Sequence, residues 1–208
     1  MNGQTLLEGV REDERTELDR LGSDKALLAA TGADLERDTV LAIVARTLDG
    51  LTTTFEAWAE ESRGQAAETF DGAAAAINDD YERVRAELDG DPAGDPPAPL
   101  PAVRTAETPA GRAGGGLVGH GLVFDGLLLQ SVSFFVNEAD REGADLFRDL
   151  RTATNRRIED GTALLDAVCT DASDWERAET AAIEVVEAAY REYVETLGEM
   201  GIDPKPVC

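Results

Sequence analysis

Apolar side chains recur at intervals of three and four residues along most of this chain, and that spacing limits the fold more than any other feature. The most regular stripe covers residues 67–88, where the two intervals alternate without a break, as in the seam of a helical bundle. Alternating runs of β-branched residues, which would predict strands, do not occur in the sequence. We therefore predict an all-α protein. The members of the stripe are Ala67, Phe70, Ala74, Ile77, Tyr81, Val84 and Leu88.

Three further stripes have the same spacing, over residues 40–58, 147–168 and 175–197. A segment rich in proline and glycine, residues 90–110, lies between the first helical regions and the later ones. Proline removes a backbone donor and disfavours helix before it, so this segment is predicted to be an extended connector. The expected organisation is a single helical domain: a four-helix bundle with one long crossover, a ferritin-like arrangement, and accessory helices at both ends.

The predicted boundaries follow the stripes and the breaks between them. The first break is "LGSD" at residues 21–24, with Ser23 or Asp24 as N-cap of a short helix that ends at Gly32, and Ser173 or Asp174 is the expected N-cap of the last helix. The division of residues 1–208 is then 1–33 for accessory helices, including one charged helix over about 4–20; 34–89 for the first helix pair; 90–110 for the crossover; 111–169 for the second pair; 173–200 for the C-terminal helix; and 201–208 for the tail.

The charge balance indicates an environment and argues against one class of partner. The chain has 43 acidic residues against 19 basic ones, for a formal net charge of −24, and its only lysines are Lys25 and Lys205. Repulsion among so many negative charges destabilises a compact fold, and molar salt relieves it by shortening the Debye length to about 3 Å. The composition is typical of a halophilic protein from a salt-accumulating cytoplasm. It argues against DNA or RNA, because nucleic-acid affinity rests largely on Lys and Arg.

Two segments bear on localisation. The N-terminal stretch has neither a basic start nor a long apolar core, so no secretory signal is expected and the cytoplasm is the default. Residues 117–136 are long enough to span a bilayer. However, Asp125 lies near the middle, where it costs about 2.5–3.5 kcal/mol on insertion scales. We predict a buried bundle helix here rather than a membrane span.

The region before this segment contains Gly114, Gly116 and Gly119 in the G-x-G-x-x-G pattern of a dinucleotide-binding turn. Such a turn needs a strand before it, and proline-rich coil precedes these glycines, so nucleotide binding is not predicted. Several glycines in one helix cost about 1 kcal/mol each in helix propensity. Either they allow another helix to come close, or the segment begins as a loop and becomes helical near Leu117.

Few residues suit a thiolate or imidazole metal site. The two cysteines, Cys169 and Cys208, are not part of a C-x-x-C motif, and His120 is the only histidine. A structural role is favoured for His120 over metal binding or titration near neutrality. Cys169 is expected to be a small core side chain. Cys208 is expected to be an exposed thiol, which leaves a redox role, an intermolecular disulfide or no role open.

Two stretches carry a resemblance to a known family. "TFEAWAEES" with "AAETFDGAAAAINDDYERVRAEL", within residues 54–88, and "ADREGADLFRDLRTATNRRIEDGTALL", residues 139–165, resemble the helix pairs of rubrerythrin-type ferritin-like proteins. The chain is similar to rubrerythrin-like proteins of haloarchaea, including the "PKPVC" tail. The resemblance implies a ferritin-like four-helix bundle. Members of that family hold two irons with one inward Glu and one Glu-x-x-His pair from each half of the bundle.

These ligands are missing from the present chain. On the first stretch the family's Glu falls on Ile77 and its His on Asp80, and on the second the Glu falls on Thr154 and the His on Arg157. No Glu-x-x-His pair exists anywhere, because the residue three before His120 is leucine. An aliphatic side chain at position 77 fills core volume, a gain of roughly 1.5–3 kcal/mol. We therefore expect a bundle supported by packing, with no metal cofactor.

The leading functional prediction is a non-catalytic, metal-free bundle that acts as a binding or interaction module, with a regulatory role open. The alternative is a rubrerythrin-type redox or metal-binding protein that holds iron in an atypical carboxylate site. That alternative needs Asp49, Asp80 and Asp125, or nearby glutamates, to converge inside the bundle. A homodimer is also predicted, because the adjacent Phe134 and Phe135 point to different faces of a helix, and one of them is available to a protein partner.

Overall fold

The computed structural model describes residues 1–92, 94, 97 and 99–204 of the chain. Within those residues the regular structure is helical and contains no strand, so the prediction of an all-α protein is confirmed. The tail that ends in Cys208 and part of the 90–110 crossover lie outside the described residues.

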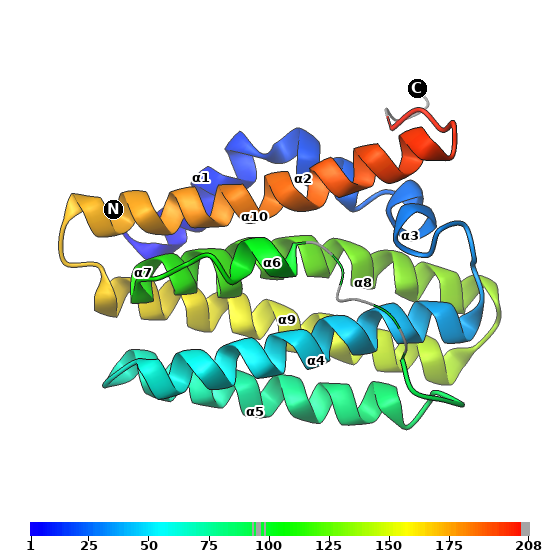
Figure 1. Cartoon of the computed structure of the whole chain (residues 1–208), viewed down its shortest axis with the longest axis horizontal. Helices are drawn as coiled ribbons and strands as arrows, with labels where there is room; N and C mark the ends of the chain where they lie inside the picture. Colours follow the sequence, from blue (N-terminus) through cyan, green and yellow to red (C-terminus); the bar gives the residue numbers. More distant parts are fainter. Residues whose placement is uncertain (93, 95–96, 98, 205–208) are drawn as a thin grey trace.

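Long helices run side by side along the longest axis of the molecule (Figure 1). Helix α4 (Arg37–Glu61) packs antiparallel to α5 (Gln65–Arg85), and α8 (His120–Asn137) packs antiparallel to α9 (Arg141–Val168). Helix α5 also contacts α9, which joins the two pairs. Asp140 caps α9 by accepting a hydrogen bond from the amide of Gly143 at 2.9 Å, and it pairs with Arg37 of α4.

The glycine-rich segment is helical from Pro109, before the point near Leu117 at which one of the two sequence-based alternatives had the helix begin. Thr108 caps α7 (Pro109–Arg112), a π-helical stretch η1 (Ala113–Gly119) follows, and α8 continues from it. The structure therefore excludes a loop that turns helical near Leu117. The helix of residues 109–137 is also long and apolar enough, by length and composition alone, to cross a membrane, and 44% of its most apolar window is buried inside the protein.

The last long helix, α10 (Ala172–Glu199), runs lengthwise beside the other long helices and contacts η1 and α8 (Figure 1). Its N-cap is Asp171, whose carboxylate accepts a hydrogen bond from the amide of Asp174 at 3.0 Å. The prediction of Ser173 or Asp174 as the cap was wrong. The signal was ambiguous, because "TDASD" offers several residues that can cap and only the backbone conformation selects one.

Short helices complete the fold. The N-terminal segment forms α1 (Gly3–Asp13), α2 (Arg15–Leu21) and α3 (Asp24–Ala30). The charged helix predicted over about 4–20 is thus divided at Glu14. As a result, α1 packs against α9, and α2 packs against α10. Within the described part of the crossover, α6 (Leu100–Val103) contacts α4, η1 and α10.

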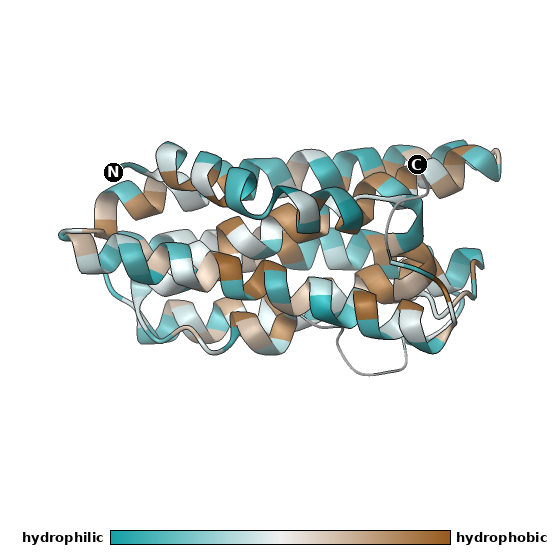
Figure 2. Ribbon diagram, turned by 90° about the horizontal axis from the view of Figure 1, so that it is seen from above, coloured by the Kyte–Doolittle hydropathy of each residue, from teal (hydrophilic) through white to brown (hydrophobic). Residues whose placement is uncertain are grey.

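The core is aromatic at several levels along the bundle. Phe55, Trp58 and Phe70 pack with ring centroids 5.1–5.9 Å apart, and Phe135 stacks on Phe147 at 4.9 Å. Ile77 is buried, as its place in the stripe predicted. Hydrophobic and hydrophilic residues alternate around each helix (Figure 2), which is the pattern that the apolar stripes require.

Candidate functional site

A buried ion pair joins α5 to α9 in the middle of the bundle. Arg157 donates a hydrogen bond from Nη1 to Oδ2 of Asp80 at 2.7 Å and another from Nη2 to the Thr154 hydroxyl at 3.0 Å. Asp80 is 5% exposed and Arg157 is 8% exposed. Arg83 of α5 also lies 3.7 Å from the other carboxylate oxygen of Asp80. We call Asp80, Thr154 and Arg157 the central cluster.

The central cluster consists of positions that the sequence comparison with the di-iron pattern had singled out. Ile77 and Asp80 lie one turn apart on α5, and Thr154 and Arg157 lie one turn apart on α9. The charged contact between Asp80 and Arg157 was not predicted, and it adds an ion pair to the packing expected at Ile77. A signal existed: residues of opposite charge each follow a buried stripe position by three residues. Without the register of α5 against α9, that signal does not show that they meet.

A small internal space of about 20 Å³ adjoins the cluster and is bordered by Ile77, Thr154 and Arg157. His120 also borders this space and is 3% exposed. Burial, aided by the positive charge of Arg157, lowers the pKa of His120 to about 3. The ring is therefore neutral at physiological pH. Of the alternatives to a structural role, titration near neutrality does not fit so low a pKa.

The carboxylates of the alternative metal site do not come together. Asp49 is exposed on α4, and Asp80 belongs to the central cluster. Asp125 accepts two hydrogen bonds from Arg151, both at 2.9 Å, and a third from Asn155 at 2.8 Å. Among the described residues, no group of three or more His, Cys, Asp or Glu side chains has an arrangement suited to a metal ion. The geometry therefore gives no support to convergence of these three residues.

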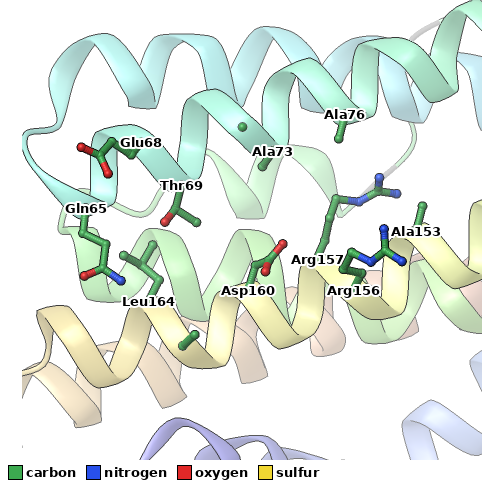
Figure 3. Close-up of a pocket in the computed structure, with 12 residues that line it drawn as sticks. Gln65, Glu68, Thr69, Ala73, Ala76, Ala153, Arg156, Arg157, Asp160 and Leu164 are labelled. Carbon is green, nitrogen blue, oxygen red and sulfur yellow. The ribbon is translucent and has the colours of Figure 1, made fainter.

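An open groove of about 630 Å³ runs beside the central cluster, between α5 and α9 (Figure 3). Small side chains line much of it, among them Ala73, Ala76 and Ala153. Arg157 reaches from α9 toward α5 at one end of the groove (Figure 3). The exposed Arg156 and Asp160 give its wall both signs of charge. The two helices are thus held by a long charged side chain where their backbones stand apart.

The glycines of η1 form no phosphate cradle, because their backbone is helical and they are buried against another helix. A Cβ atom built on Gly114 would lie 2.1 Å from the carbonyl oxygen of Ala178, and one on Gly119 would lie 2.6 Å from that of Ala182. A Cβ on Gly116 would lie 2.6 Å from the ring of Trp58. These distances are below any contact that real Cβ atoms make, so the glycines are there for close helix packing.

The remaining candidates have different surroundings. Phe135 is fully buried and serves the core, while Phe134 is half-buried beside it with the rings in an edge-to-face contact at 5.1 Å. Cys169 is the C-cap residue of α9 and is half-buried, and burial together with nearby aspartates raises the pKa of its thiol to about 11. A thiol with so high a pKa is a poor nucleophile. Cys208 lies outside the described residues.

Comparison of the chain with protein-family models, with curated proteins and with solved structures gave no significant match.

Proposed function

We propose that this protein is a non-catalytic, metal-free bundle of the ferritin-like type that acts as a binding or interaction module. The observation that carries the proposal is the central cluster. At the level where the resemblance to rubrerythrin-type proteins would put metal ligands, the chain has a guanidinium, a carboxylate, a hydroxyl and the buried Ile77.

The chemistry of the cluster supports a metal-free centre. Arg157 is a permanent cation, and its contact with Oδ2 neutralises the Asp80 carboxylate, which a metal ion would need as a ligand. A carboxylate buried without a cation is costly, so an arginine removes the need for a metal at this place. The ordering of Thr154 by the same guanidinium leaves a fixed, closed contact rather than an open coordination position.

The test is elemental analysis for iron, manganese and zinc on protein purified in molar salt without chelator. We expect metal far below one ion per chain, and no acceleration of iron(II) oxidation over buffer. Stoichiometric metal that disappears in Asp80→Asn but remains in Asp71→Asn would favour the alternative, a redox protein with an atypical carboxylate site. Asp71 is the matched control because it is exposed on the same helix as Asp80 and is not part of that site.

A second copy of this chain is the partner that we propose for the outer face of α8. Leu129 and Val136 are exposed there and lie two helical turns apart, on the same face as the half-buried Leu122. A face of this kind can pair with itself across a two-fold axis. Light scattering in molar salt should give a dimer, and Val136→Asp should give a monomer. Leu35→Asp, at another exposed leucine outside α8, is the control that should stay dimeric.

We also propose that the protein works in the cytoplasm of a halophile, where its excess of negative charge is the adaptation to molar salt. The formal net charge of −24 supports this, because salt screens the repulsion between surface carboxylates. Thermal unfolding should shift to higher temperature as potassium chloride is raised to molar levels. An unfolding temperature that does not change with salt would remove the proposal.

A further inference from the structure

A partly open cavity of about 130 Å³ lies among α3, α4, α8 and α10, with Leu21 of α2 and Pro97 and Pro99 of the crossover also in its wall, apart from the groove between α5 and α9. Apolar side chains make most of its wall, among them Ala29 of α3, Ile43 of α4, and Val123 and Leu127 of α8. An engineered apolar cavity of about 150 Å³ in another protein binds benzene. The volume therefore suits a single six-membered aromatic ring.

One wall of this cavity is formed by His120, which also borders the small space beside Arg157. Its ring contacts Phe124 with centroids 5.6 Å apart. Within the part of the chain that the structure describes, no hydrogen bond of either ring nitrogen of His120 is found, although neither nitrogen is among the side-chain atoms that are both fully buried and unpartnered. A neutral imidazole has one N–H donor and one acceptor nitrogen, and both are expected to be satisfied when the ring is buried.

Two other polar groups in the wall are already engaged. The Thr47 hydroxyl donates to the carbonyl oxygen of Ile43 at 2.9 Å, and the Tyr193 hydroxyl donates to that of Pro204 at 3.1 Å. His120 therefore brings hydrogen-bonding groups to a mostly apolar wall, in which Glu192 and Thr196 of α10 are the remaining polar side chains. This combination of apolar walls and a few well-placed polar groups is typical of a small-molecule site.

We propose that this cavity binds a small uncharged aromatic molecule with one hydroxyl, whose ring lies among the apolar side chains and whose hydroxyl hydrogen-bonds to His120. A charged ligand fits less well, because apolar walls do not solvate an ion. An anion would in addition meet Glu192 in the wall and a chain of net charge −24. The inference deepens the proposed binding role and rests on it.

Phenol is the probe, and toluene, which replaces the hydroxyl by a methyl group, is its comparison. Titration calorimetry of the full chain in molar salt should show saturable phenol binding. Toluene should bind several-fold to about tenfold more weakly, which is the range for one hydrogen bond. Because His120 is the only histidine, the nitrogen NMR signals of its ring are unambiguous and should shift with phenol.

Two variants separate the cavity from the hydrogen bond. Ala29→Met extends a flexible side chain into the cavity and should abolish binding of both probes. His120→Phe should remove the preference for phenol over toluene. Ala75→Met is the matched control, because Ala75 is exposed on α5 and does not line the cavity, so it should leave both affinities unchanged.

The inference is overturned if phenol does not saturate, if phenol and toluene bind equally well, or if phenol still binds Ala29→Met with wild-type affinity. If His120→Phe does not fold, the proposal is still tested by the shift of the wild-type ring-nitrogen signals with phenol and by the loss of phenol binding in Ala29→Met. A failure of phenol to bind leaves the metal-free assignment untouched, whereas stoichiometric metal in the elemental analysis contradicts that assignment and says nothing about phenol.

Discussion

The contact of η1 with α10 and the contact of α5 with α9 join helices of the same bundle in opposite ways. Gly114 and Gly119 bring the backbone of η1 directly against Ala178 and Ala182 of α10, with no room for a further atom. Helices α5 and α9 stand apart around the groove, and Arg157 spans the distance to Asp80. The first contact depends on side-chain atoms that are absent, and the second on one long side chain that is present.

This difference predicts how each contact fails. Adding a methyl group should break the glycine contact, because nearby backbone cannot move away without displacing a helix. Removing one charge should break the other contact, because it leaves the partner charge buried. The following changes test this comparison, from the largest expected effect to the smallest.

Arg157→Met should lower the free energy of unfolding by about 3–5 kcal/mol, because Asp80 is left buried without its main partner. Denaturant unfolding in molar salt measures the loss. The double variant Asp80→Leu with Arg157→Met should recover most of it, since a buried pair replaced by apolar side chains is often neutral. Arg83→Met is the control: Arg83 is 44% exposed, and its loss should cost less than about 1 kcal/mol. Equal costs for Arg157→Met and Arg83→Met would contradict a central role for the buried pair.

Gly114→Ala should lower the free energy of unfolding by about 1–3 kcal/mol or more, although alanine is the better helix former. The new Cβ would lie 2.1 Å from the carbonyl oxygen of Ala178, so α10 has to shift. Hydrogen exchange should show faster exchange in α10 while α4 and α5 stay protected. Unchanged protection of α10 would show that this contact tolerates the extra atom.

His120 lies between the two contacts and should make stability depend on pH. Its folded pKa, about 3, is below its ordinary value of 6.5, so the unfolded chain binds the proton first as the pH falls. The contribution of the neutral ring to the free energy of unfolding is complete above about pH 6.5. It is lost as the pH falls from about 6.5 to 3, by up to about 1.4 kcal/mol per pH unit. Between pH 7.5 and 5, the free energy of unfolding should therefore fall more steeply with decreasing pH for the wild type than for His120→Phe. Identical slopes would place the ring in contact with water.

Gly72→Ala should have the smallest effect and the opposite sign. Gly72 lies in α5 at the edge of the groove, and a Cβ there meets nothing within 4 Å. Replacing it by alanine should raise the free energy of unfolding by about 0.4–1 kcal/mol, because the unfolded chain loses conformational freedom. The measurement is the thermal unfolding temperature of Gly72→Ala, compared with those of the wild type and of Gly114→Ala. A destabilised Gly72→Ala would show that α5 and α9 come closer in solution.

Much of the fold was predictable because local patterns determine helices. The stripe over residues 67–88 predicted α5, and Ile77 is buried as that pattern requires. The prolines between residues 90 and 110 predicted a break, although α6 forms within it. The cap of α10 and the division of the N-terminal segment at Glu14 were not predictable, because several residues offer similar local signals and packing selects among them.

The candidate site shows where the sequence alone stops. The sequence by itself determined that no Glu-x-x-His pair exists, that an aliphatic residue lies at position 77 and that one histidine is available. Only the tertiary structure decided that Asp80 meets Arg157, that Asp125 pairs with Arg151 instead, and that His120 faces a cavity. The physical reason is range: helical periodicity arises from neighbours within one turn, whereas contacts between helices depend on register and separation that no single segment contains.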